Sequence, residues 1–501
     1  NALQMSTSET KRKTRRPKPR IEADNKREMA RIKRKQNKLQ KEKDDLEKLN
    51  RGLLAEIEEL KKINQNQQKT IINQQKSLDD SSVIPKAKLK FHSYDRTTID
   101  LALRLYYETP SSLSSIPRIM EVYNKVLGID MPIPTDDTIA LWAKRYGLCA
   151  LRQAGSEMRE DSPYAIVMDE SMFVCGQILL LLLRIPSQHP SRPLVAGDLV
   201  PIGMHVGKSH NSEEIKGELE KAIKTQGYDP DYILTDGCST MKKGVSLSGY
   251  PRVPDVSHML GTAFEHTYKK DTGFVKFMKN AGVTSFKNVM QKDVAYLLAP
   301  KQRSVARFLN ISSTIQWAHS VNSTYGSLGK EAQDAFSFIP EMSAQIEEYR
   351  KASNVISGIE EEIKNNGASR STIDKILCQL KENADSGNER ESRLYREMSS
   401  SLSEMRDTIP TGKEYNASSD IIESTFGVYK SKMASNKRNG ITALSLTIPG
   451  RMAMQSNTKP LDIMYALEST RTKDVAQWKD SNLMENQVKR RFLTLHANQQ
   501  Q

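Results

Sequence analysis

The stretch at 164–170 reads YAIVMDE, and the stretch at 232–237 reads YILTDG. Each is a short apolar run of strand length that ends on an acidic residue, Asp169 in the first and Asp236 in the second. The glycine after Asp236 permits a tight turn that exposes the carboxylate. If the two strands are neighbours in one sheet, we expect their carboxylates to meet at one edge.

Further strand patterns surround these two. Apolar runs at 177–185, 199–206 and 252–256 predict three more strands, and a capped segment at 212–225 predicts a helix between the third and fourth strands. This order predicts an α/β core over residues 160–260. An apolar strand that ends on Asp is common in α/β enzymes, so an ordinary surface role for Asp169 stays open.

The third acidic candidate lies far along the chain. The segment ASSDIIESTFGVYKSK predicts an N-capped helix, within a region at 416–440, that carries Glu423 in its first turns. Asp236 and Glu423 are separated by 187 positions. The intervening region, 261–415, is polar with helical patterns, which predicts an all-helical insertion.

Carboxylates gathered from remote positions suit Mg²⁺, which prefers oxygen ligands. Phosphodiester cleavage and strand transfer use two metal ions about 4 Å apart, one at the attacking oxygen and one at the leaving oxygen. We therefore hypothesise that Asp169, Asp236 and Glu423 are catalytic metal ligands. The alternatives to Glu423 as the third acid are Glu170, Asp255 and Glu265.

Three motifs resemble those of the DDE transposases of bacterial insertion sequences, within the ribonuclease H-like superfamily. They are MDES at 168–171, LTDG at 234–237 and IIESTFGVYK at 421–430, and the resemblance covers roughly 164–260 and 416–440. It implies a ribonuclease H-like core with a mixed five-stranded sheet. It also implies two bound Mg²⁺ ions, for which Mn²⁺ can substitute, and metal-dependent cleavage and strand transfer at transposon ends.

The resemblance assigns expectations to four other residues. Lys430, on the same helix face as Glu423, would contact a DNA phosphate. Asp255 and His258 would orient a ligand or a water molecule, although a structural role for the histidine is an equal alternative. Trp317 would stack on a displaced base. Core packing is the competing interpretation of this tryptophan.

The N-terminus is strongly basic in a chain whose net charge is +14. Residues 1–21 predict a disordered arm, and seven of the ten residues at 11–20 are Lys or Arg. Binding to double-stranded DNA, at transposon ends and target, is the expected role; a solubilising tail or a nuclear-import run is the alternative. The expected DNA contacts in the arm are Lys11, Arg12, Lys13, Arg15 and Arg16.

Residues 22–80 predict a coiled coil that joins two copies of the chain. Leucines recur every seven residues at Leu39, Leu46, Leu53 and Leu60, and asparagines at the other seam position favour a parallel dimer. The alternative is a single solvated helix that packs on its own protein. A basic segment that leads into a leucine zipper resembles the bZIP arrangement, although Asn25 lies too close to the first leucine for the base-reading role. Four further DNA contacts are expected there: Arg27, Arg31, Lys33 and Arg34.

The region 90–150 predicts three short helices, at 96–108, 114–126 and 135–146. A helix-turn-helix module that binds DNA through Lys144 and Arg145 fits this layout. A three-helix connector is the alternative. The end of the chain, 441–501, predicts a helical tail.

Length and composition limit the class of protein. The 501 residues suggest roughly three or four domains. The longest apolar run, 178–183, is too short to span a bilayer, so we expect no membrane partner. Four scattered cysteines fit a reducing intracellular compartment, such as bacterial cytoplasm and nucleoid, or a nucleus if the host is eukaryotic.

Two other functions share these features. A metal-dependent nuclease or resolvase would use the same acids without joining ends. A domesticated transposase or DNA-binding regulator would use the basic coiled coil while its catalytic core is inactive.

Overall fold

The chain divides into two compact units, residues 1–85 and 86–501. None of the described helices is long and apolar enough to cross a membrane. The computed structural model describes residues 18–81, 93–154, 162–171, 174–301, 307–433, 439–457 and 460–496. The five basic residues expected to contact DNA from the arm lie outside this part.

The first unit contains one long helix, α1 (Lys18–Ser81). It begins inside the segment predicted as a disordered arm, because the basic residues that follow Pro17 are good helix formers. Side chains at 25–65 are exposed, and the four heptad leucines are between 49% and 65% exposed. A helix that exposes its apolar seam gains little stability from packing within a single chain.

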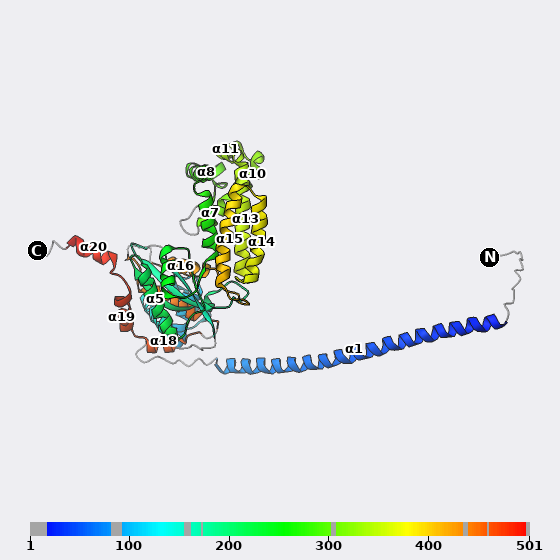
Figure 1. Ribbon diagram of the computed structural model, residues 1–501. Helices are drawn as coiled ribbons and strands as arrows, with labels where there is room; N and C mark the ends of the chain where they lie inside the picture. Colours follow the sequence, from blue (N-terminus) through cyan, green and yellow to red (C-terminus); the bar gives the residue numbers. More distant parts are fainter. Residues whose placement is uncertain are drawn as a thin grey trace, which may run out of the picture. The chain divides into compact units, whose positions relative to one another are not determined.

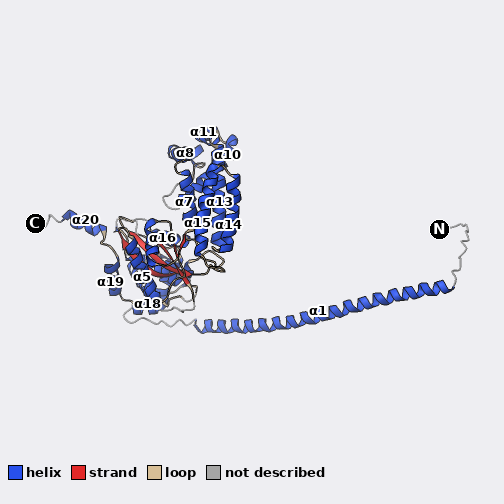
Figure 2. Ribbon diagram, viewed as in Figure 1, coloured by secondary structure: helices blue, strands red, loops and turns tan. Residues whose placement is uncertain are grey.

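Five strands of the second unit form one sheet, shown in red in Figure 2. Their order is β3-β2-β1-β4-β5; β1 pairs antiparallel with β2 and parallel with β4, β2 pairs antiparallel with β3, and β4 pairs parallel with β5. The predicted mixed five-stranded sheet is confirmed. The strands are β1 (Tyr164–Glu170), β2 (Ile178–Pro186), β3 (Val200–Gly207), β4 (Ile233–Thr235) and β5 (Arg252–Pro254).

Both faces of the sheet are buried, which explains why the strands read as continuous apolar runs. Alternate residues of β1 belong to different apolar clusters: Val167 belongs to a large cluster shared with the helices of residues 256–408, and Ile166 to a smaller one. Helices α5 (Ser212–Gln226) and α6 (Ser239–Ser248) contribute to the smaller cluster. The fifth strand ends at Pro254, earlier than predicted, because Asp255 caps the next helix.

Between β5 and Thr408 the described residues are mainly helical. Figure 1 shows α7, α10, α13, α14 and α15 side by side as a bundle. The helices of the whole region are α7 (Val256–Tyr268), α8 (Thr272–Asn288), α9 (Lys292–Ala295), α10 (Arg307–Thr324), α11 (Lys330–Ala335), α12 (Phe338–Glu341), α13 (Ser343–Asn366), α14 (Arg370–Ser386) and α15 (Glu389–Thr408). The chain then returns to the sheet with α16 (Asp420–Lys432), which contacts β1.

The three predicted N-terminal helices are present as α2 (Arg96–Glu108), α3 (Ile116–Leu127) and α4 (Asp136–Gln153). They share an apolar core with α17 (Thr447–Met454) and α18 (Ile463–Ser469). The segment predicted as a C-terminal tail therefore packs into the body of the unit as far as α19 (Thr472–Asn482), whose Val475 is buried against Leu148 and Leu446. The helix that follows, α20 (Gln487–His496), has no buried residue.

Candidate active site

Asp169 and Asp236 lie at the same edge of the sheet. Strands β1 and β4 are parallel neighbours, and Met168 is in register with Thr235. Asp169 is the residue after Met168, and Asp236 is the residue after Thr235. The two acids therefore come directly after a pair of residues that lie opposite each other. This is the arrangement that the two apolar runs predict, because parallel neighbouring strands end at the same edge.

The Asp169 carboxyl group lies beside two other acidic side chains, Asp236 and Glu423. Burial and the nearby negative charge of Asp236 raise its pKa to about 8, and Glu423 contributes in the same direction. The backbone N–H of Glu170 donates to its Oδ1 at 2.7 Å and opposes part of this effect. Like charges held together in this way favour an added cation.

Glu423 reaches this edge from the first turn of α16. Its Oε1 lies 3.2 Å from Nε2 of His258, a residue in the first turn of α7. This contact raises the pKa of His258 to about 9 against the opposing effect of burial, and the charges of Asp255 and Asp236 add to the shift. A protonated imidazole therefore partly neutralises the acidic group.

Asp255 joins the helix of His258 to the helix of Glu423. Its Oδ1 accepts a hydrogen bond from the His258 backbone N–H at 2.7 Å, which caps α7. Its Oδ2 accepts from the backbone N–H and the hydroxyl of Ser419, at 2.6 and 2.9 Å, where α16 begins. Burial raises the pKa of this carboxyl, which is only 1% exposed. Asp255 thus holds together the N-terminal ends of α7 and α16, the helices that carry His258 and Glu423.

Arg252 holds the turn that carries Asp236. Its Nε donates to the Thr235 hydroxyl at 2.8 Å, and its Nη2 donates to the Asp236 carbonyl oxygen at 2.6 Å. The Asp236 carboxylate accepts from the Cys238 backbone N–H at 3.0 Å. Sequence reasoning missed Arg252, because an arginine at the start of a strand carries no signal for a contact with another strand.

Glu170, one alternative for the third acid, has a different partner. Its Oε1 lies 2.5 Å from Nδ1 of His210, whose Nε2 lies 3.0 Å from Nδ1 of His205. These side-chain contacts connect β1, which carries Glu170, with β3, which carries His205, and with the segment after β3, which carries His210. Asp255 is engaged with Ser419, and Glu265 lies seven residues beyond His258 along α7. Among the candidates for the third acid, Glu423 is the one whose charge raises the pKa values of both Asp169 and His258.

Among the residues that the structure describes, no three His, Cys, Asp or Glu side chains form a ready-made metal-binding group. The donor chemistry nonetheless fits a hard cation, because burial and the negative charges of Asp236 and Glu423 raise the pKa of the Asp169 carboxyl. Mg²⁺ commonly binds through one or two carboxylates together with substrate oxygens and water. Asp169, Asp236 and Glu423 are therefore the residues that would hold it.

Two expected DNA contacts have structural roles instead. Arg145 is buried, and its guanidinium donates to the carbonyl oxygens of Leu467 and Thr470, so its assignment to DNA is wrong. Trp317 donates from Nε1 to the Leu297 carbonyl oxygen at 2.7 Å and packs against the ring of Phe336. Core packing, the competing interpretation, describes this tryptophan.

The remaining expected contacts stay predictions. Lys144 is half-buried, and burial lowers its pKa. Lys430 lies in the last turn of α16, with its ammonium 5.9 Å from the ring of Phe426. The basic side chains of α1 are exposed along that helix: Arg27, Arg31, Lys33 and Arg34.

No protein-family model matches this sequence, and no curated protein matches it either.

Proposed function

We propose that this chain is a DDE-type DNA transposase, which cleaves DNA at transposon ends and joins the freed ends to target DNA. One observation carries the proposal: Asp169 near the end of β1 and Asp236 directly after β4 lie at the same edge of two adjacent parallel strands, and Glu423 is near enough to raise the pKa of Asp169. We further infer a ribonuclease H-like core. The sheet order β3-β2-β1-β4-β5, with acids after β1 and β4, supports this inference.

Each residue of the site has a role that follows from its contacts. Asp169, Asp236 and Glu423 would hold Mg²⁺, or Mn²⁺ in its place. Bound there, the ions would activate the attacking oxygen and stabilise the leaving oxygen of the phosphodiester. His258 holds the Glu423 side chain, and Asp255 fixes the starts of both helices. Arg252 fixes the turn of Asp236.

Binding to DNA would be supplied by the first unit. The exposed Arg27, Arg31, Lys33 and Arg34 of α1 can contact phosphates, and the exposed heptad leucines can pair with a second copy of the chain. A protein that neutralises many phosphates releases counterions. We therefore expect affinity for transposon ends to fall steeply with salt concentration.

The experiment uses the full chain and a plasmid that carries the DNA flanking its gene. With Mg²⁺ or Mn²⁺ we expect cleaved ends and joining into a second plasmid, and with EDTA neither product. Asp236→Asn should abolish both products while gel-shift affinity for the same DNA is retained. Asp480→Asn, an exposed residue of α19 (Thr472–Asn482), is the matched control and should behave as wild type.

The outcomes separate the related functions. Cleavage without joining would identify a nuclease or resolvase on the same acids. Full activity of Asp236→Asn, or activity in EDTA, would refute the metal-dependent mechanism.

A DNA-binding regulator is the second candidate, because the exposed basic face of α1 needs no catalytic centre to bind DNA. Under this function the chain binds DNA and changes transcription, and Asp236→Asn leaves both properties intact. Loss of joining in that variant would exclude it.

A further inference from the structure

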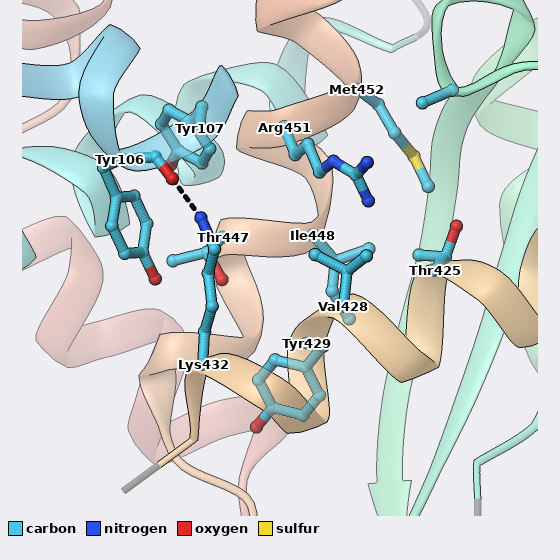
Figure 3. A pocket seen from close by; sticks show the side chains of 11 residues that line it. Tyr106, Tyr107, Thr425, Val428, Tyr429, Lys432, Thr447, Ile448, Arg451 and Met452 are labelled. Carbon is cyan, nitrogen blue, oxygen red and sulfur yellow. Dashed lines mark hydrogen bonds between the residues drawn. The ribbon is translucent and has the colours of Figure 1, made fainter. Parts of the chain in front are cut away.

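A cavity beside helix α16 contains two cationic side chains and no acidic one among the described residues that line it. It lies between α16, α17 and the end of α2, and about 380 Å³ of space among these residues is not filled by atoms, part of it open to solvent. Figure 3 shows Lys432 and Arg451 entering from different helices, Lys432 on the side of Tyr106 and Arg451 on the side of Thr425. The cavity is therefore electropositive.

Lys432 is held at the C-terminal end of α2. Its ammonium donates to the carbonyl oxygens of Tyr106 and Thr109, and it lies 4.2 Å from the centre of the Tyr106 ring. Burial and, to a smaller extent, the positive charge of Arg451 lower its pKa to about 8. The two cations are thus close enough to repel each other.

The Arg451 side chain makes no hydrogen bond or ion pair with the described residues, although it is half-buried. Burial lowers its pKa. Other arginines in the second unit pair with acids, such as Arg192 with Asp198 at 2.7 Å and Arg406 with Asp374 at 2.5 Å. The five N–H donors of this half-buried guanidinium therefore have no acceptor among the described side chains and depend on water. An anionic ligand would satisfy them.

We propose that this cavity binds the phosphoryl group of a phosphate anion, through Arg451 with help from Lys432. A guanidinium can donate two parallel hydrogen bonds to a phosphate, and a lysine supplies a compact charge beside it. The source is either free phosphate or a phosphate of DNA, which present the same chemistry.

The cavity is separate from the acidic edge of the sheet. Lys432 follows Glu423 by nine residues, or two and a half turns, so the two side chains leave opposite faces of α16. The proposal consequently stands whether or not the chain is a transposase, and its test needs no cleavage.

The test measures thermal unfolding of the full chain in sodium phosphate and in sodium chloride at equal ionic strength and pH. Phosphate should raise Tm by about 1–3 °C at tenfold excess over its Kd. Arg451→Met should lose this shift. Arg393→Met, an exposed arginine of α15 outside the cavity, is the control and should keep it.

A second variant guards against misfolding of Arg451→Met. Ala196 lines the cavity, and Ala196→Glu places a carboxylate beside the cations while both remain. It should also abolish the phosphate shift. An unshifted wild type, or a shift that survives in both cavity variants, would overturn the proposal.

Oligonucleotides identify the source of the phosphate. A larger Tm rise with a 5′-phosphorylated strand than with the 5′-hydroxyl strand, lost in Arg451→Met, assigns a DNA end. A rise with inorganic phosphate and equal effects of the two strands assigns free phosphate. Either result supports the cavity as an anion site.

Discussion

Helix α1 and the sheet edge of Asp169 both carry charges on which the proposed function depends, but the charges of α1 are exposed to solvent and Asp169 is partly buried. The edge is enclosed by the second unit, and its strands are buried on both faces. Along α1 the side chains at 25–65 are exposed, including the leucines of the heptad pattern. The residues of the edge therefore come from one unit of the chain, whereas α1 leaves its apolar seam exposed, where we expect a second copy to pair.

The same difference appears in the strength of the electrostatic interactions. At the edge, burial and neighbouring carboxylates raise the pKa of Asp169 to about 8. On α1 the pairs Lys38–Glu42 and Lys43–Glu47 lie at 3.9 and 3.8 Å in solvent, where such pairs contribute little. Substitutions at the edge should act on chemistry, and substitutions on α1 should act on assembly.

The largest effect is expected from Asp169→Asn. Several kcal/mol of electrostatic stabilisation depend on such ligands, so single-turnover cleavage should slow by about 10³-fold. Affinity for DNA in a gel shift should not change. Because ionisation of the partly buried Asp169 opposes folding, the metal-free variant should be at least as stable to heat as wild type, and more stable above about pH 8. Cleavage at the wild-type rate by this variant would contradict the expectation that the sheet edge performs the chemistry.

On α1 the corresponding change is Leu46→Asp. Loss of a buried leucine from a dimer seam costs about 2–5 kcal/mol, so the dimer Kd should rise at least about 30-fold in sedimentation experiments. Leu49→Asp is the control, because Leu49 is 60% exposed against 64% for Leu46 but lies off the seam. Equal effects of the two variants would contradict the coiled coil.

An intermediate effect is expected from Asp255→Asn, which replaces an acceptor of the Ser419 hydrogen bonds by a donor. Cleavage should fall roughly 10–100-fold, and the free energy of unfolding should fall by about 1–3 kcal/mol. Adding Ser419→Ala should change little more, because the interaction is already broken. Additive effects in a double-mutant cycle would show that Asp255 does not act through α16.

The smallest effect is expected from Trp317→Phe, in the helical bundle. The variant keeps the ring contact and loses the hydrogen bond to Leu297, so unfolding should become easier by about 1 kcal/mol. Cleavage should change less than about twofold. A large loss of cleavage at unchanged stability would instead support base stacking.

Local patterns predicted much of the fold. The apolar runs before Asp169 and Asp236 place both strands within a few residues, because a short apolar run between turn residues has few other solutions. Capping residues placed α4 and α5 in the same way, as with Thr135, whose hydroxyl accepts from the Thr138 backbone N–H. The third acid was also predicted, although its distance from the other two along the chain made it the least certain from sequence.

Arg145 shows where local reasoning fails. Its position near the end of a well-capped basic helix predicts an exposed DNA contact. The guanidinium instead satisfies carbonyl oxygens of a segment more than 300 residues away. No local pattern encodes that partner, because it exists only after α18 has packed against α4.

By itself, the sequence determined the elements, the heptad seam of α1 and the acids after β1 and β4, since all of these depend on residues close together in the chain. Only the tertiary structure decided that β1 lies beside β4 and that Asp255 accepts hydrogen bonds from Ser419. It also decided that Lys432 and Arg451 line one cavity, with no acidic side chain among the described residues around it. Those contacts join remote segments, and their energies come from burial and charge that appear only when the segments meet.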